Sequence, residues 1–228
     1  MSDWYQIVPP ESTLMQGDVV FNCPRVVLPD DLTLDSVDRG DFEVDIIYTN
    51  AVIITQSCDI GSKEASEILL CPIYPFTSWL QTVDDYILNS AKGHNTKKIV
   101  EKAYENLRKG GYSAFHFLNK DNKVSFNDFQ VVALNRPFSL NTAIVKQMLK
   151  GQQKIVRLNS PYREHLSQAY ATLYMRVGLP TNIPRDLASP ESYLPTTDFV
   201  EDAKKIVKAK EEAAEAKKKA EQASTAAS

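Results

Sequence analysis

The chain of 228 residues contains only three cysteines, Cys23, Cys58 and Cys71. An odd number of cysteines without a paired spacing does not suit a disulfide framework, so we expect reduced thiols. The sequence also lacks an apolar run near the roughly 20 residues that span a bilayer, and its first residues do not resemble a signal peptide. These absences predict a cytoplasmic protein that has no membrane partner.

An excess of positive charge is missing as well, because the formal net charge is −3. Dedicated nucleic-acid-binding proteins usually carry a basic face that neutralises phosphates. The overall composition therefore argues against that class and leaves only local basic patches as candidates. The rest of the composition, with 43% apolar and 24% charged residues, is that of an ordinary globular protein. We predict no cofactor.

Apolar runs bounded by turn residues predict strands at residues 17–24, 44–55, 67–74, 112–118, 124–134 and 154–158. Three-to-four-residue spacing of apolar positions predicts helices after Thr77, before Gly110, at 141–150 and at 161–177. Residues 25–43 are rich in Pro, Asp and Gly, and are typical of a surface loop or a long hairpin. The predicted class is α+β.

The predicted organisation is one domain over residues 1–178, with a helical insertion at about 77–110 and a packed C-terminal helix at 161–177. Residues 179–198 contain several prolines and little periodicity, which favours a linker. Residues 199–228 are dominated by Ala, Glu and Lys, so we expect a charged helical tail that is partly disordered. We expect this tail to have too few apolar side chains to pack firmly.

Three short motifs occur in an order that resembles the small barrel of PemK/MazF-like proteins. They are Gly17-Asp18-Val19, the apolar strand ILLCP at 68–72 and the strand VSFNDFQVV at 124–132. The resemblance covers roughly residues 14–138 and implies a small SH3-like or MazF-like β-barrel with inserted and C-terminal helices. It also implies the metal-independent cleavage of single-stranded RNA, in which a hydroxyl residue and an arginine support attack by the ribose 2′-hydroxyl.

Thr77 and Ser78 match the position of the hydroxyl residue, but the position of the arginine holds Thr49-Asn50-Ala51. Phosphoryl transfer needs a cation or dense donors around the phosphate. We therefore predict a catalytically silent regulatory or scaffold module that binds a protein partner, in a prokaryotic toxin, defence or signalling system (for example as an anti-sigma-like component). The alternatives are an active endoribonuclease that uses Arg136 or Arg25 as its cation, and an RNA-binding module without cleavage.

Two other types of site are compatible with the residue types. Cys58 and His116 would suit a thiol nucleophile and its base. Cys23, Cys58, Cys71 and His116 have the atom types of a zinc site, but they lack the close spacing of zinc motifs, so we predict no metal. In both cases the alternative is packing of these side chains in or beside buried strands.

Three groups of residues are candidate contacts to RNA or to a partner. The inserted helical region is locally basic, and the start of the helix at 161–177 adds two further candidates. Alternating aromatic residues at 112–117 are candidates for a platform on which bases stack. The alternative for the charged residues is a solvated helix face, and for the aromatic residues it is ordinary packing. The charged candidates are Lys97, Lys98, Lys102, Arg108, Lys109, Arg163 and His165, and the aromatic ones are Tyr112, Phe115 and Phe117.

Overall fold

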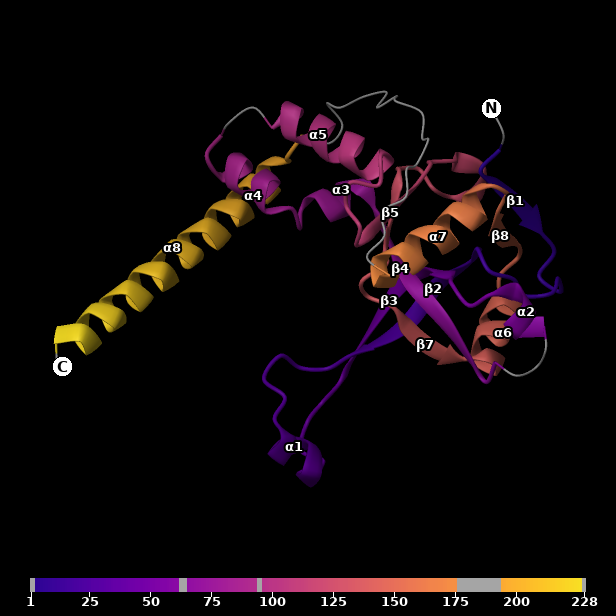
Figure 1. The fold of residues 1–228 in the computed structure, drawn as a ribbon, viewed down its shortest axis with the longest axis horizontal. Coiled ribbons are helices and arrows are strands. Elements are labelled where there is room, and N and C mark those ends of the chain that lie inside the picture. The colour runs from indigo at the N-terminus through magenta and orange to yellow at the C-terminus, as the bar shows by residue number, and fades with distance from the viewer. Residues whose placement is uncertain (1–2, 62–64, 94–95, 176–193, 227–228) are drawn as a thin grey trace. The chain divides into compact units, whose positions relative to one another are not determined.

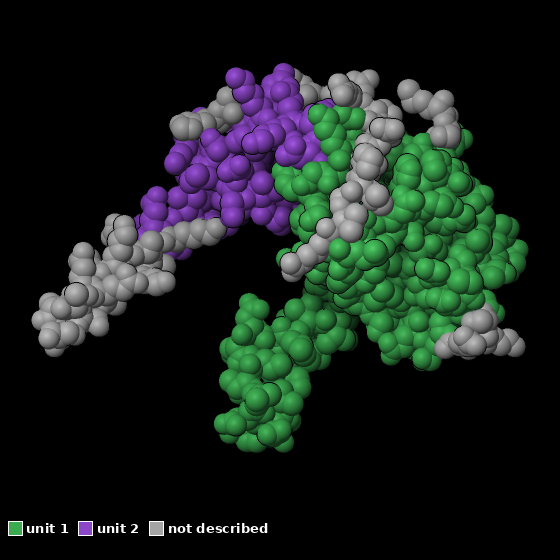
Figure 2. Space-filling model, in the orientation of Figure 1, with its two compact units in different colours: residues 1–75, 107–182 green, residues 76–106, 183–228 purple. Residues whose placement is uncertain are grey.

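The computed structural model describes residues 3–61, 65–93, 96–175 and 194–226. The chain divides into two compact units, coloured green and purple in Figure 2. Unit 1 contains residues 1–75 and 107–182, and unit 2 contains residues 76–106 and 183–228. The predicted linker at 179–198 lies mostly outside the described residues.

Unit 1 is built on an eight-stranded sheet in which every pair of neighbouring strands is antiparallel (Figure 1). The order is β1-β8-β2-β3-β4-β6-β5, and β7 pairs with another part of β4. With the helices, this sheet confirms the predicted α+β class. The strands are β1 (Tyr5–Val8), β2 (Asp18–Val27), β3 (Asp45–Ile53), β4 (Glu67–Pro75), β5 (Phe115–Leu118), β6 (Gln130–Ala133), β7 (Phe138–Asn141) and β8 (Ile155–Leu158).

The predicted closed barrel is not confirmed, because no ladder between the described strands joins the two end strands, β1 and β5. Side chains nevertheless bridge these strands. The Tyr5 hydroxyl donates to the Asn119 carbonyl at 2.6 Å, and the rings of Trp4 and Phe117 meet edge to face with centroids 6.3 Å apart. The sheet therefore curves enough to bring its ends into side-chain contact without hydrogen-bonding them into a ring.

A buried apolar cluster fixes the sheet against α6 (Thr142–Gly151). The alternating positions Ala51 and Ile53 on β3 contribute to it, since successive residues of a strand point to opposite faces. Val145 and Leu149 lie four residues apart on α6 and supply the helix side. This packing agrees with the helical periodicity that the sequence shows at residues 141–150.

Three further helices belong to unit 1: α1 (Leu34–Arg39), α2 (Ser57–Gly61) and α7 (Tyr162–Met175). Helix α7 is anchored at its first residue, because the Tyr162 ring stacks on Trp4 with centroids 3.8 Å apart. Leu166, one turn further, is completely buried. These two contacts attach the predicted C-terminal helix of the domain to unit 1.

Unit 2 contains α3 (Phe76–Leu80), α4 (Asp84–Ala91), most of α5 (Lys97–Arg108) and α8 (Thr197–Ala226). The sequence predicted one helix that starts after Thr77, but the structure has two. Helix α3 begins at Phe76, so Thr77 lies inside it and is not its N-cap. The break follows Leu80, where the Thr82 hydroxyl donates to the Trp79 carbonyl at 2.7 Å and competes with the helical pattern.

The C-terminal helix packs better than the sequence indicated. Phe199 lies against Tyr86 of α4, with ring centroids 5.3 Å apart, and Ala203 is completely buried. The expectation of a tail too polar to pack was therefore wrong for the first turns of α8. Its composition is Ala- and Lys-rich overall, but the few apolar residues are concentrated where the helix meets α4.

Candidate functional site

The most distinctive feature of unit 1 is an extension formed by the far ends of β2 and β3, which we call the arm (residues 24–48). Its two strands pair in register, with Pro24 opposite Tyr48 and Val26 opposite Ile46. Helix α1 lies at its tip, and Figure 1 shows this tip well away from the rest of the sheet. The arm is thus a long hairpin, one of the two alternatives that the sequence predicted for residues 25–43.

The arm arises because β2 and β3 continue beyond the strands that flank them. Strand β8 pairs with β2 only at Asp18 and Val19, and β4 pairs with β3 only from Asn50 onward. A register shift between Val20 and Cys23 marks the start of the extension, where the Asn22 amide donates to Asn50 Oδ1 at 3.2 Å. Such bulges bend a strand and change the direction of the residues beyond them. In the arm, the outer edges of both strands have no neighbouring strand among the described residues.

Local hydrogen bonds shape the tip of the arm, although no residue of α1 is buried. The Thr33 side chain caps the helix by accepting from the Ser36 amide, and the Ser36 hydroxyl accepts from the Thr33 amide in return. Gly40, with a φ of 65°, ends the helix in the left-handed conformation that glycine adopts without strain. The tip therefore holds its shape without a core of its own.

Large apolar side chains are exposed along the whole arm. Leu34 at the tip is 84% exposed, and Tyr48 at the base is 67% exposed. A two-stranded hairpin is marginally stable on its own in water, and exposed apolar patches commonly mark interaction sites. The nine exposed side chains are Val26, Leu28, Leu34, Val37, Phe42, Val44, Ile46, Ile47 and Tyr48.

The arm is also strongly acidic. Between residues 24 and 48 it has seven carboxylates and only two arginines, Arg25 and Arg39. Apolar and acidic side chains are interspersed, so the surface combines contact area with a negative field. The carboxylates are Asp30, Asp31, Asp35, Asp38, Asp41, Glu43 and Asp45.

The structure does not join Cys58 and His116 into a catalytic pair. Cys58 is exposed on α2, where its thiol is within hydrogen-bonding distance of Gln56 and Asp59. His116 is buried on β5, and no hydrogen bond between the two is found among the described residues. Burial lowers the pKa of His116 to about 4, and the nearby His165 acts in the same direction. His116 is therefore a neutral side chain of the sheet at physiological pH.

The candidate zinc ligands are not brought together either. Among the described residues no group of three or more His, Cys, Asp or Glu side chains is placed to hold a metal ion. Burial raises the pKa of Cys23 to about 11 and that of Cys71 to about 12, so both are neutral thiols inside the sheet. They have the role of small apolar side chains.

The residues that the family resemblance singled out belong to different elements of the two units. Thr77 and Ser78 are exposed on α3 in unit 2, whereas Arg136 is exposed between β6 and β7 in unit 1. Arg25 lies in the arm opposite Ile47. Asn50, at the position where the resemblance implies an arginine, accepts a hydrogen bond from the Asn22 amide and so helps to shape the bulge.

The basic candidates differ in accessibility. Lys98, Lys102 and Lys109 are exposed, Lys97 is half-buried, and Arg108 is only 4% exposed. Arg108 interacts within the protein, so its guanidinium is not available to a partner.

The start of α7 is similarly engaged. The Arg163 guanidinium donates to Glu164 at 2.7 Å, and His165 is half-buried. Of the three aromatic residues, Phe117 is 1% exposed and packs against Phe129, so it cannot stack on a base. Phe117 therefore has the ordinary packing role that the sequence left open as the alternative to base stacking.

No protein-family model matches this chain, and no curated protein matches it. Among the helices of the described residues, none has the length and apolar character to cross a membrane.

Sequence reasoning did not identify the arm as a functional surface. The signal was present, because Leu28, Leu34 and Val37 recur among the aspartates of a segment that otherwise has loop composition. Because β2 and β3 pair beyond their neighbouring strands, these residues lie at the far end of the arm, and only the structure shows this.

Proposed function

We propose that the chain is a regulatory or scaffold module that binds a protein partner through the arm. The observation that supports this is the exposure of nine large apolar side chains on a two-stranded extension. Burying such side chains stabilises an interface by roughly 25 cal/mol for each Å² of apolar surface removed from water. The open strand edges add a second mode of recognition, since a partner strand can pair with them.

The charge of the arm defines the chemistry of this partner. Seven carboxylates against two arginines favour a surface rich in Lys and Arg that also offers apolar side chains. The same charge repels phosphate backbones, so the arm does not suit RNA. A basic, amphipathic segment of another protein satisfies both the apolar and the acidic features.

The sheet itself is proposed to be a divergent, catalytically silent relative of the PemK/MazF barrel. This part of the proposal is supported by Asp18, which opens β2 directly after Gly17, and by the Trp4 and Tyr5 contacts, which bring the end strands together. Asn50 supplies no positive charge and is engaged with Asn22. An asparagine at this position offers no cation to stabilise charge on a phosphate in the transition state.

Site-specific photo-crosslinking tests the role of the arm. A photoreactive amino acid at Val26 or Ile46, in cells that produce the chain naturally, is expected to give a discrete protein adduct. The control is Ile144, which is similarly exposed but lies on α6. The double substitution Asp35→Lys/Asp38→Lys should remove the adduct, because it reverses charge at the tip while leaving the apolar side chains in place.

Adducts of the same proteins from Ile144, or none from the arm, would contradict the proposal. Adducts of only twice the chain's mass would show self-association in place of a separate basic partner.

Catalytic silence is tested separately by incubating the purified chain with mixed single-stranded RNA without metal. Internal cuts that disappear in Thr77→Ala and Arg136→Ala would establish the endoribonuclease alternative.

A further inference from the structure

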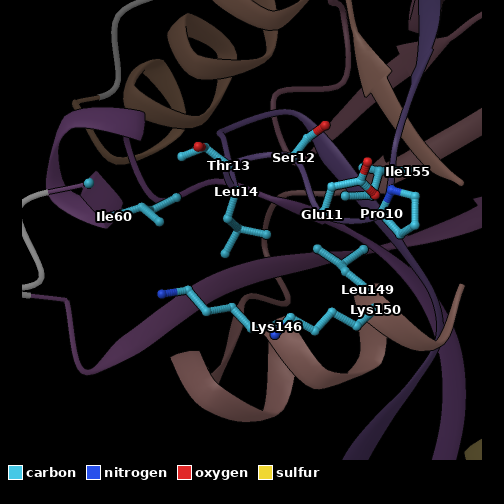
Figure 3. Close-up of a pocket in the computed structure, with 11 residues that line it drawn as sticks. Pro10, Glu11, Ser12, Thr13, Leu14, Ile60, Lys146, Leu149, Lys150 and Ile155 are labelled. Atoms are coloured by element: carbon cyan, nitrogen blue, oxygen red, sulfur yellow. The ribbon is translucent and has the colours of Figure 1, made fainter.

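A pocket of about 300 Å³ lies in unit 1 between the segment that precedes β2 and helix α6 (Figure 3). None of its lining residues belongs to the arm. Its floor is apolar and consists of side chains that are at most 5% exposed: Leu14, Ile60, Leu149 and Ile155. This volume is at the lower end of the range for small-molecule sites, which are typically apolar with a few polar groups.

Both walls of the pocket are held in place by hydrogen bonds. On one side, the Ser12 amide donates to the Pro9 carbonyl at 3.0 Å, and Arg157 donates to the Thr13 carbonyl at 2.7 Å. On the other side, Asn141 caps α6 by accepting from the Ala143 amide at 2.9 Å. A pocket with fixed walls avoids the entropic cost of ordering loops when a ligand binds.

Two lysines of α6 line the pocket, Lys146 and Lys150. They lie four residues apart, so they share one face of the helix, and Figure 3 shows both on the α6 side of the pocket. Neither ammonium group has an ion pair or a hydrogen bond among the described residues. Like charges at this spacing destabilise a helix, so an anion between them would relieve an unfavourable interaction.

Glu11 also lines the pocket and limits the charge that it accepts. Two lysines and one carboxylate leave a single net positive charge, which suits a monoanion better than a dianion. We propose that this pocket binds a small aliphatic carboxylate, with its charged group at Lys146 and Lys150 and its hydrocarbon part against Leu14 and Leu149. This site is independent of the arm and of the partner proposed for it.

The probe for this site is hexanoate, titrated into the full chain with carbon-13-labelled methyl groups. We expect saturable shifts of the methyl resonances of Leu14, Leu149 and Ile155. Hexylamine has the same apolar part and the opposite charge, so it should bind at least about tenfold more weakly. The substitution Lys146→Gln or Lys150→Gln should weaken hexanoate binding about threefold each, as expected for exposed charge pairs.

The matched control is Lys98→Gln/Lys102→Gln, which changes two exposed lysines at the same spacing on α5. This variant should bind hexanoate as tightly as the unchanged chain. Equal binding of hexanoate and hexylamine would overturn the proposal, as would a Lys146→Gln/Lys150→Gln variant that binds hexanoate with unchanged affinity. Methyl resonances that fail to saturate with hexanoate would overturn it too.

Discussion

The two halves of the β2–β3 hairpin share strands and hydrogen-bonding pattern but differ in burial. In the inner half, where β3 also pairs with β4, Val52 and Ile53 are completely buried. A few residues earlier on the same strand, Ile46 is 57% exposed and Tyr48 is 67% exposed. Both halves are apolar, so hydrophobicity alone does not decide which half belongs to the core.

The difference comes from the neighbouring strands and helix. The inner half lies between β8 and β4 and is covered by α6, whereas the arm has no strand on either outer edge among the described residues. Apolar residues in the inner half therefore stabilise the fold, and those in the arm are available to stabilise a complex. This distinction predicts that matched substitutions in the two halves have very different effects.

The largest effect is expected from the buried ion pair between Arg157 of β8 and Asp18, the first residue of β2. Arg157 donates to both carboxylate oxygens of Asp18, at 2.5 and 2.9 Å, and both side chains are buried. Arg157→Leu should lower the free energy of unfolding by about 4 kcal/mol, because it leaves a buried carboxylate without its partner. Urea unfolding at neutral pH measures this loss.

Arg25 in the arm is the control for this substitution. It has no ion pair among the described residues, so Arg25→Leu should change the free energy of unfolding by no more than about 0.5 kcal/mol. Similar losses in the two variants would mean that the arm is as important to the fold as the sheet.

A second comparison uses two isoleucines on the same strand. Ile53→Ala should cost about 3 kcal/mol, since it removes buried methylene groups and leaves a cavity in the cluster against α6. Ile46→Ala should cost no more than about 0.5 kcal/mol, because its side chain is already in water. Thermal or urea unfolding of the two variants measures the difference, and a loss of about 2 kcal/mol or more for Ile46→Ala would contradict it.

The third prediction concerns pH. The pKa of His116 is about 4 in the folded protein, below the ordinary value of about 6.5 expected after unfolding. Between these values the unfolded state binds a proton that the folded state does not, so stability is complete above about pH 6.5 and falls as the pH is lowered. Going from about pH 7 to pH 5 should cost about 2 kcal/mol.

Two variants locate the origin of this pH dependence. His116→Gln should flatten the dependence between about pH 7 and pH 5, because it removes the titrating group. A variant in which Asn-Gly replaces residues 25–47 keeps only the two end residues of the arm and should leave the dependence unchanged. The prediction fails if the arm-less chain loses the dependence or if His116→Gln retains it.

The sequence predicted the elements of unit 1 well where a short-range pattern determines them. The strands around Val19, Ala51 and Leu70 follow apolar runs between turn residues, and α6 follows helical spacing. The helix break after Leu80 was missed because a local turn forms there, in which the Thr82 amide and hydroxyl both donate to the Trp79 carbonyl, and the apolar spacing carries no sign of it.

The candidate sites could not be predicted because they depend on contacts between distant residues. The pocket forms only when Leu14 meets Leu149, and its sole sequence signal was the spacing of Lys146 and Lys150 on the predicted helix. For His116 the sequence left both a catalytic role and burial beside a strand open, and the pairing of β5 with β6 decides for burial. The outward direction of the arm depends similarly on the bulge at Asn22.

The smallest expected loss of stability comes from replacing glycine by alanine at two positions with similar backbone conformations. Gly17 has a φ of 83°, and a Cβ there would lie 3.1 Å from Arg163 Cγ and 3.2 Å from Leu158 Cβ. Gly40 in the arm has a φ of 65° with no atom within 4 Å of such a Cβ. Gly17→Ala combines left-handed strain with crowding in the sheet and should cost about 1.5 kcal/mol in the free energy of unfolding.

Gly40→Ala introduces similar backbone strain, but at the tip of the arm, where α1 has no buried residue. The strain can be relieved by local opening of the tip, so global unfolding should change by less than about 0.5 kcal/mol. Hydrogen exchange should then show faster exchange only in residues 33–41. If Gly40→Ala lowered the global stability as much as Gly17→Ala, the tip would have to be coupled to the sheet, and the arm would be part of the folding unit as well as a surface for a partner.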